Sequence, residues 1–393
     1  MAPFTCPSRQ RVLFLFLLLM MTTASGCGQG PWALWNAYAA RFIDGQGRVI
    51  DPQGAGRTTS EGQSYALFFA LANNDPARFD QVLKWTQANM AGGNMGAHLP
   101  GWLWGKSKEG EWKQLDANPA ADSDVWIAYS LAEAGRLWKN PAYATLARQM
   151  MAQIAKREVT ELPGFGLMLM PGPTALFTHN HTWTVNPSYV PLFIFDRFAS
   201  IDPAGPWRDI ALNIPRLTKQ TARKGFAMDW ADYVPNDGFY PAPNPGLVQA
   251  GKTVPPATGS YDAIRVYLWA GMMDGNGQAR TEMVGAVSGM AAYITNHGAP
   301  PEKVSDQGVP SEQDGPVGFS AAVLPYLRAL PEMEKASARQ RVRMGTQLDT
   351  SSGLYGKDPA YYDQNLVLFA TGFLDGRFRF GPRGELKVEW TRS

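Results

Sequence analysis

Cysteine is nearly absent from this chain of 393 residues. Cys6 and Cys27 are the only two, and both lie near the N-terminus. No disulfide can form within residues 28–393, so a large hydrophobic core has to stabilise the fold. The chain can supply such a core, because 45% of its residues are hydrophobic. This composition is compatible with one large domain or with two of ordinary size.

An excess of charge of one sign is also missing. The net charge is +2, and no block of basic residues occurs, so nucleic acids and anionic membranes are poor candidates for partners. Histidine is scarce, and the pair His179 and His181 has no neighbouring Cys or acidic cluster. We therefore expect no metal site and no cofactor. The chain also lacks a Gly-rich nucleotide-binding motif and a G-x-S-x-G nucleophile elbow.

Only one long hydrophobic run occurs, "VLFLFLLLMM", which follows Arg9 and Arg11 and precedes "TTASGCGQG". The run is too short for an ordinary transmembrane helix. A basic start, a short apolar run and small residues predict a signal peptide over residues 1–26, with cleavage before Cys27. We expect an exported protein, periplasmic or secreted. The letters "ASGC" also resemble a bacterial lipobox, which leaves a lipid on Cys27 as the alternative.

The remaining chain, residues 27–393, shows no linker and is predicted to form a single catalytic domain. Its apolar periodicity predicts twelve helices. They lie near 31–43, 60–74, 76–90, 122–138, 141–156, 187–200, 204–221, 259–273, 276–296, 316–329, 333–348 and 361–374. Alternating residues predict short β-hairpins over 102–116, turning near Glu109 and Gly110, and over 376–390.

Twelve helices predict an all-α fold, an (α/α)6 barrel of six helical hairpins closed into a toroid with short β-hairpins at its rim. If the first helix is outer, the even-numbered helices form the inner ring and their N-termini share one rim. The side chains at these N-termini are acids or tyrosines: Glu61, Asp122, Asp124, Tyr189, Asp262, Tyr361 and Tyr362.

Glu61 and Asp262 are the strongest candidates for chemistry. Taken alone, each is an ordinary first-turn acid that complements the helix dipole. Ser60 and Gln63 can form a capping box around Glu61, and Ser260 can cap the helix that follows Asp262. Together on one rim, however, two carboxyl groups are what glycosidic bond hydrolysis requires, one to donate a proton and one to activate water.

The other rim residues fit a sugar site, although each also has a structural interpretation. Asp122 and Asp124 can hold a sugar ring or cap their helix. Tyr189, Tyr361 and Tyr362 can offer hydroxyls and stacking faces or pack in the core. Thirteen Trp is a high count, and the predicted sugar platforms, with core burial as the alternative for each, are Trp102, Trp104, Trp183 and Trp230.

Five motifs resemble glycoside hydrolase family 8, in the order seen in that family. They are "RTTSEGQSYALFFAL", "NPAADSDVWIAYSLAEAGRLW", "NPSYVPLFIF", "YDAIRVYLWAG" and "YYDQNLVLFATGF". The resemblance covers nearly the whole chain after the leader, and it is closest to the periplasmic endoglucanases of bacterial cellulose synthase complexes. It implies an (α/α)6 barrel and an inverting endo-hydrolase of β-1,4-linked glycans.

The resemblance also implies roles for single residues. Glu61 matches the general acid and Asp262 the general base, with Arg265 as its orienting partner. Asp122 matches the acid that contacts the sugar at the cleavage point, and Tyr189 matches a tyrosine near the attacking water. The family signature usually reads A-S/T-D-A/G-D, whereas this chain has "AADSD" at residues 120–124. We therefore expect both Asp to be retained but their hydrogen bonds to differ.

The expected function is that of an endo-β-1,4-glucanase that acts on cellulose as a monomer and supports bacterial cellulose biosynthesis, in functional association with a cellulose synthase complex. Alternative substrates for the same fold are xylan, chitosan and mixed-linkage glucan. A non-catalytic alternative is an exported glycan-binding or scaffold protein. A polysaccharide lyase is disfavoured, because an acidic rim repels the uronic acids that lyases bind.

Overall fold

The computed structural model describes residues 32–249, 252–275 and 277–391, so the predicted signal peptide and Cys27 lie outside the described residues. This part of the chain contains thirteen α-helices. They are α1 (Ala33–Phe42), α2 (Ser60–Ala72), α3 (Pro76–Met90), α4 (Ala121–Leu137), α5 (Pro141–Arg157), α6 (Leu192–Ile201), α7 (Trp207–Thr221), α8 (Ile264–Met272), α9 (Gln278–Ala286), α10 (Ser288–His297), α11 (Val317–Ala329), α12 (Glu334–Gly345) and α13 (Tyr361–Leu374).

Most of these helices lie within a few residues of their predicted positions. The segment predicted as one helix at 276–296 is two, α9 and α10, because Val287 leaves the helical conformation with φ −108° and ψ 25°. The helix predicted from 187 begins as α6 only after Pro191, and a short 3-10 helix (Pro187–Tyr189) precedes it. A helix start depends on local backbone contacts that apolar periodicity does not encode.

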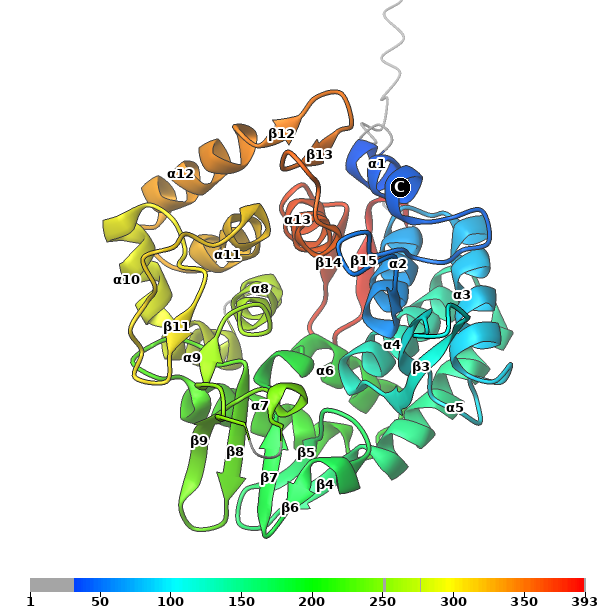
Figure 1. Cartoon of the computed structure of the whole chain (residues 1–393), viewed down its shortest axis with the longest axis horizontal. Coiled ribbons are helices and arrows are strands. Elements are labelled where there is room, and N and C mark those ends of the chain that lie inside the picture. The colour runs from blue at the N-terminus through cyan, green and yellow to red at the C-terminus, as the bar shows by residue number, and fades with distance from the viewer. Residues whose placement is uncertain (1–31, 250–251, 276, 392–393) are drawn as a thin grey trace, which may run out of the picture.

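The helices form two concentric rings (Figure 1). The inner ring consists of α2, α4, α6, α8, α11 and α13, and the outer ring of α1, α3, α5, α7, α9, α10 and α12. Inner helices are surrounded by protein, so α2, α4, α8 and α11 bury nearly all of their residues, whereas α6 buries only about half of its own. Every residue of α8 is buried, whereas the outer helix α12 buries only Ala336, Gln340 and Met344. The predicted (α/α)6 barrel is thus confirmed.

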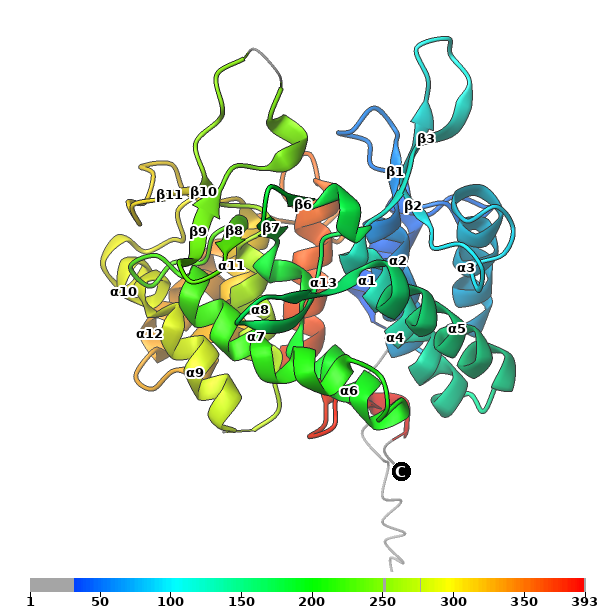
Figure 2. The same cartoon turned by 90° about the horizontal axis from the view of Figure 1, so that it is seen from below.

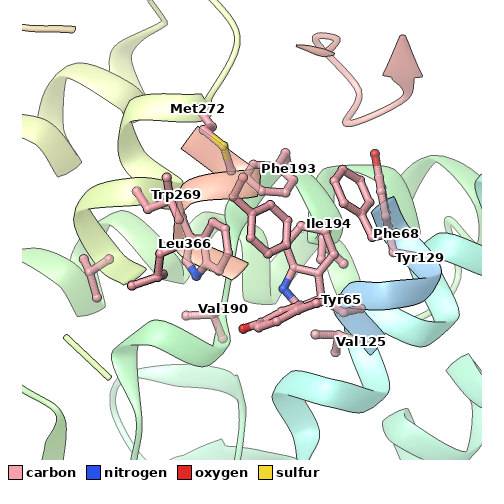
Figure 3. Close-up of a cluster of buried hydrophobic side chains, with 14 of the residues drawn as sticks. Tyr65, Phe68, Val125, Tyr129, Val190, Phe193, Ile194, Trp269, Met272 and Leu366 are labelled. Atoms are coloured by element: carbon pink, nitrogen blue, oxygen red, sulfur yellow. The ribbon is translucent and has the colours of Figure 1, made fainter. Parts of the chain in front are cut away.

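Aromatic side chains fill the centre of the barrel (Figure 3). The ring centroid of Trp126 in α4 lies 5.3 Å from that of Trp269 in α8 and 5.0 Å from that of Phe369 in α13. Phe193 in α6 stacks on Phe380 with centroids 3.8 Å apart. The barrel is therefore a packed core rather than a channel, and this core supports the inner helix N-termini at one end.

Short strands lie between the helices. One sheet has three strands, β1 (Thr58–Thr59), β2 (Gly101–Lys106) and β3 (Trp112–Pro119). A second has four, β6 (Thr178–His179), β7 (Thr182–Val185), β8 (Trp230–Val234) and β9 (Gly238–Ala242). The two-stranded sheets pair β4 (Val159–Leu162) with β5 (Gly166–Leu169), β10 (Thr258–Gly259) with β11 (Val304–Ser305), β12 (Leu348–Asp349) with β13 (Leu354–Tyr355), and β14 (Phe378–Phe380) with β15 (Leu386–Val388).

The two predicted hairpins are confirmed as β2–β3 and β14–β15. They lie at opposite ends of the barrel (Figure 2). The β14–β15 hairpin is held by buried Glu133 of α4, which accepts a hydrogen bond from Leu386 N at 2.8 Å and forms ion pairs with Arg136 and Arg197. This network closes the end remote from the helix N-termini. No helix in the described part of the chain is long and apolar enough to cross a membrane.

Candidate active site

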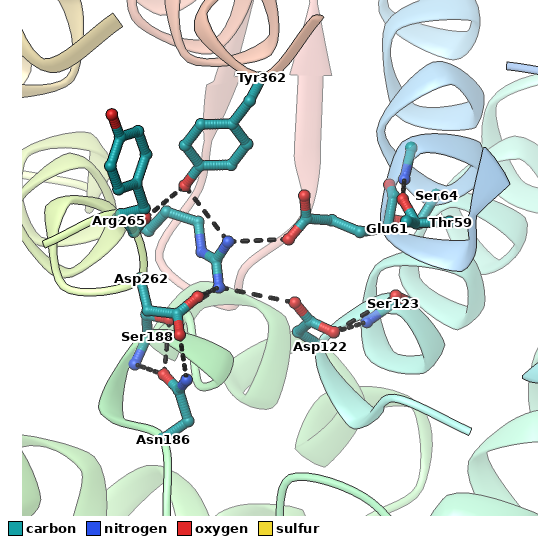
Figure 4. A network of polar contacts seen from close by, with 12 residues as sticks. Thr59, Glu61, Ser64, Asp122, Ser123, Asn186, Ser188, Asp262, Arg265 and Tyr362 are labelled. Atoms are coloured by element: carbon teal, nitrogen blue, oxygen red, sulfur yellow. Dashed lines mark hydrogen bonds and ion pairs between the residues drawn. The ribbon is translucent and has the colours of Figure 1, made fainter. Parts of the chain in front are cut away.

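Four side chains predicted for one rim converge on the guanidinium of Arg265 (Figure 4). Nη1 of Arg265 donates to Glu61 Oε2 at 2.8 Å and to Tyr362 Oη at 3.3 Å. Nη2 donates to Asp262 Oδ1 at 2.9 Å, and Asp122 Oδ2 lies 3.7 Å from it. The N-termini of these inner helices therefore share one rim, as predicted. The Arg265 side chain, which is 3% exposed, lies at the centre of the contacts.

Arg265 has a larger part than the sequence predicted. It was expected to orient Asp262, but its two terminal nitrogens also join Asp262 to Glu61 across the barrel axis. Nη2 donates in addition to Ser188 Oγ at 3.0 Å. A buried cation among several carboxyl groups offsets their mutual repulsion and fixes their positions.

Glu61 stands at the start of α2, and it is the one residue of that fully described helix that is not buried. The predicted capping box is wrong. Thr59 is the N-cap, and its hydroxyl accepts a hydrogen bond from Gly62 N at 3.2 Å. Ser60 instead donates to Ser123 Oγ at 2.9 Å, while the amide of buried Gln63 bonds to the preceding loop and to α3. These contacts of the neighbouring residues fix the backbone of Glu61 at the start of α2.

Asp262 lies in the turn before α8, not inside a helix that begins at 259 as predicted. Its Oδ2 accepts a hydrogen bond from Asn186 Nδ2 at 3.0 Å, so both of its oxygens have a donor. The turn is held by Asp229, whose Oδ1 accepts from Ser260 N and Ala263 N at 2.7 Å each. The predicted cap, Ser260, donates instead to Glu302 O. A carboxylate distant in sequence therefore positions the Asp262 turn.

Asp122 occupies the first turn of α4, where its Oδ1 accepts from Ser123 N at 2.7 Å and from Ser123 Oγ at 3.3 Å. The hydroxyl that departs from the family signature thus contacts the acid directly, in line with the expected change in hydrogen bonding. Asp124 does not reach the rim: it is fully buried, and its carboxyl group interacts with that of Glu158. Its predicted contact with a sugar is therefore corrected to a role inside the protein.

The environment favours a protonated Glu61 near neutral pH. Burial raises the pKa of Glu61 to about 8 against the opposing charge of Arg265, and the charges of Asp122 and Asp262 add to the rise. The Glu61 side chain nevertheless remains 21% exposed, so its proton is accessible. One carboxyl group is thus suited to donate a proton, while a second, Asp262, is 24% exposed and held by two donors.

The three predicted tyrosines all lie at this site. The Tyr189 ring faces the Arg265 guanidinium at 5.7 Å. Tyr362 Oη donates to Tyr261 O at 2.6 Å, and Tyr361 Oη lies 3.3 Å from Thr59 Oγ1.

Tyr361 also explains the glycine beside the acid. A Cβ on Gly62 would stand 2.7 Å from Tyr361 Oη, so the absent side chain makes room for this tyrosine.

The predicted tryptophans are less uniform. Trp230 packs edge-on against Tyr189, with centroids 6.0 Å apart, and is nearly buried. Trp104 is enclosed by Trp85 and Trp112 and by the guanidinium of Arg48. Trp183 packs against Tyr233, and Trp102 is half-buried in β2. Their roles as sugar platforms stay predictions.

An open pocket of about 360 Å³ lies above the carboxyl pair. Glu61, Asp262, Arg265, Tyr361 and Tyr362 line it, as expected from the sequence, and so do residues that were not predicted: Asp51, Gln53, Arg57, Thr59, Tyr261 and Ala360. Asn186 and Ser188 were also missed as contacts of Asp262 and Arg265, although both belong to the quoted motif "NPSYVPLFIF". In the described residues, no group of three or more acidic, His or Cys side chains could hold a metal ion.

Known proteins resemble this chain along nearly its whole length. The endoglucanase of Xanthomonas axonopodis pv. citri (strain 306) is 45% identical over 366 residues, which are 92% of this chain and 90% of that protein. The endoglucanase of Escherichia coli (strain K12) is 40% identical over 383 residues, 97% of each chain. The crystal structure of endo-1,4-D-glucanase from Vibrio fischeri ES114 has a TM-score of 0.82 and 35% identity, and the match covers 92% of this chain and all of that one.

The family model described as glycosyl hydrolases family 8 matches residues 7–375. This range includes Glu61, Asp122 and Asp262, whose carboxyl groups converge at the rim. The matches to the relatives cover more than nine-tenths of the chain. The chain therefore belongs to glycosyl hydrolase family 8.

Proposed function

We propose that this protein is an endo-β-1,4-glucanase that hydrolyses internal bonds of cellulose with inversion. The observation that carries the proposal is the pair Glu61 and Asp262, held on one guanidinium at the wall of an open pocket. Membership of a glycoside hydrolase family and relatives named endoglucanases support the reaction and the class of substrate.

In this mechanism Glu61 donates its proton to the glycosidic oxygen, and Asp262 accepts a proton from a water molecule that attacks the anomeric carbon. Asn186 and Arg265 hold the Asp262 carboxylate in the orientation for that step. Inversion requires room for the water, so we expect the two carboxyl groups to be about 6.5–9.5 Å apart when substrate is bound. Asp122 contacts the sugar at the cleavage point, and Tyr189 lies near the water.

Inversion at a β-linked sugar gives an α-anomer as the first product. We expect proton NMR, recorded during the first minutes of cellohexaose hydrolysis, to detect the new reducing end in the α form before mutarotation. A carboxyl separation near 5 Å would favour a covalent intermediate and retention instead. A β-anomer as the first product would therefore exclude Asp262 as a general base.

The pH above which activity falls should reflect the pKa of Glu61. A general acid acts only while protonated, and the pKa of Glu61 is raised to about 8. We expect kcat/KM to fall as the pH rises through about 8, because the proton to be donated is then lost. A pH series of reducing-sugar release on carboxymethyl cellulose measures this limb. Constant activity to about pH 10 would contradict the assignment of Glu61 as the acid.

The same assay separates the alternative functions. Carboxymethyl cellulose, xylan, chitosan and a mixed-linkage glucan are compared at equal concentration, and cellulose is expected to be the preferred backbone. A glycan-binding protein without activity would bind cellohexaose and release no reducing ends. A lyase would produce unsaturated sugars that absorb in the ultraviolet, and it would need a uronic acid substrate.

We further propose that the enzyme is exported, acts in the periplasm or outside the cell as a monomer, and supports cellulose biosynthesis in association with a synthase complex. This proposal rests on the leader-like residues 1–26 and on the family resemblance, and both the leader and Cys27 lie outside the described residues. Mass analysis of the mature N-terminus separates cleavage before Cys27 from a lipid on Cys27.

A further inference from the structure

The four-stranded sheet β6–β9 has one covered face and one open face. Strands β7–β9 extend outward from the inner ring near α8 (Figure 1). On the covered face, Tyr233 and Phe239 pack against Phe165, and Arg216 of α7 lies over the Phe165 ring at 4.5 Å. Residues alternate between faces along a strand, so the neighbours of Tyr233 and Phe239 point the other way.

The open face carries polar and aromatic side chains in one row across three strands. Thr184 of β7 is paired with Asp232 of β8, and Asp232 is paired with Tyr240 of β9. Thr184 Oγ1 donates to Asp232 Oδ1 at 2.6 Å, which fixes the carboxylate. Asp232 is half-buried, and Tyr240, in the edge strand β9, is 47% exposed.

Packing contacts through buried Trp230, which lies between Tyr189 and Phe177, connect this row to the candidate active site. Trp230 lies on the same face of β8 as Asp232, two residues earlier, which corresponds to about 7 Å along the strand. The Trp230 ring contacts Tyr189 at 6.0 Å, and Tyr189 faces Arg265 at 5.7 Å. The inner end of the sheet is thus packed against the active site through Trp230 and Tyr189, and the exposed part of the row begins at Asp232.

We propose that the open face of β7–β9 is a distal subsite for glucose units of the same β-1,4-glucan, with Asp232 and Tyr240 as its binding residues. The inference rests on the proposed function, since the ligand is the substrate chain. A carboxylate held by Thr184 accepts charge-assisted hydrogen bonds from sugar hydroxyls. An exposed tyrosine offers a rigid apolar face to a sugar ring and a hydroxyl at its edge.

A purely structural interpretation is that Thr184 and Asp232 only stabilise the sheet as a cross-strand pair. The two interpretations differ in their dependence on substrate length. A structural defect affects every substrate and the melting temperature, whereas a distal subsite matters only for chains long enough to reach it. The conservative variant Asp232→Asn retains an oxygen for Thr184 but loses the charge, so it keeps the sheet and weakens the sugar contact.

The test compares kcat/KM on cellohexaose with kcat/KM on the shortest cello-oligosaccharide that the wild-type enzyme still cleaves. Asp232→Ala and Tyr240→Ala are expected to reduce the value for cellohexaose at least about tenfold more than the value for the short substrate, mainly through KM. Asp232→Asn should give a smaller effect in the same direction. The matched control is Asp209→Ala at an exposed position of α7, which should change neither value by more than about twofold.

Equal losses on long and short substrates, or no loss at all, would overturn the distal subsite. These outcomes are distinct from a failure of the proposed function, in which the wild-type enzyme would not cleave cellohexaose. If the variants prove too unstable to assay at one temperature, the length ratio measured for Asp232→Asn still decides, because this variant preserves the Thr184 hydrogen bond.

Discussion

Replacement of Glu61 by glutamine is expected to lower kcat on a soluble β-1,4-glucan by about 10²–10⁴-fold, while the fold and the affinity for glucan are retained. Glutamine has the same shape as glutamic acid, and its side-chain oxygen can still accept the hydrogen bond from Arg265 Nη1. It has no acidic proton for the leaving oxygen. Reducing-sugar assays measure kcat, circular dichroism reports the fold, and calorimetry with cellohexaose reports binding.

The matched control is Glu334→Gln, because Glu334 is also a first-turn acid but belongs to the exposed outer helix α12. This variant should retain wild-type activity within about twofold. A Glu61→Gln enzyme with full activity would remove Glu61 from the mechanism. Loss of glucan binding together with activity would show that Glu61 acts in ground-state binding and not only as an acid.

The same substitution should also change stability in a pH-dependent way. The pKa of Glu61 is raised on folding to about 8, so its contribution to stability is complete below its unfolded-state pKa and is lost as the pH rises through about 8. Glutamine does not titrate. The melting temperature of Glu61→Gln relative to wild type should therefore increase between about pH 5 and about pH 9, and a constant difference would contradict the raised pKa.

The assignment of helices to the inner and outer rings was predictable, because a buried inner helix has a longer apolar run in its sequence than an outer helix. The segment "SEGQSYALFFALA" continues beyond its polar start as the apolar run "YALFFALA", and in the structure every residue of α2 except Glu61 is buried. A single acid at the start of such a helix is conspicuous, and the alternation of inner and outer helices then places it on one rim with Asp262. Periodicity was therefore sufficient to place the two carboxyl groups on one rim, although it gave twelve helices where the described part of the chain has thirteen.

The supporting contacts of the site could not be predicted, because they join segments that are distant in the chain. Asp229 holds the turn of Asp262 from 33 positions earlier in the sequence, through two backbone N–H groups. Local capping rules favoured Ser60 and Ser260, yet both hydroxyls have tertiary partners instead. The reason for Gly62 is likewise tertiary, because its missing side chain makes room for Tyr361.

The four-stranded sheet was missed for a different reason. Its strands contain only two to five residues, so none provides a long alternating pattern. Only the pairing of β7, β8 and β9 reveals that Thr184, Asp232 and Tyr240 share a face. Trp183, predicted as a sugar platform, belongs to the strand beside them but packs against Tyr233.

Replacement of Arg265 by methionine is expected to reduce kcat/KM by about 10²–10³-fold and to destabilise the fold by about 3–5 kcal/mol. Methionine approximates the length of the arginine stem but leaves Glu61, Asp262 and Asp122 without their shared cation. Kinetics on carboxymethyl cellulose and denaturant unfolding at one pH measure the two effects. Wild-type activity in this variant would contradict a positioning role for Arg265.

The pH profile separates positioning from general damage to the fold. The charge of Arg265 lowers the pKa of Glu61, so its removal should move the alkaline limb of the residual activity above about 8. Arg265→Lys retains a charge but cannot bind Glu61 and Asp262 through a planar fork. The alkaline limb of the Arg265→Lys pH profile should stay near pH 8, because the retained charge sets the proton affinity of Glu61. The activity of this variant should still fall, because the geometry of the guanidinium sets the alignment of Glu61 with Asp262. An identical limb in wild type and both variants would mean that Arg265 acts on stability alone.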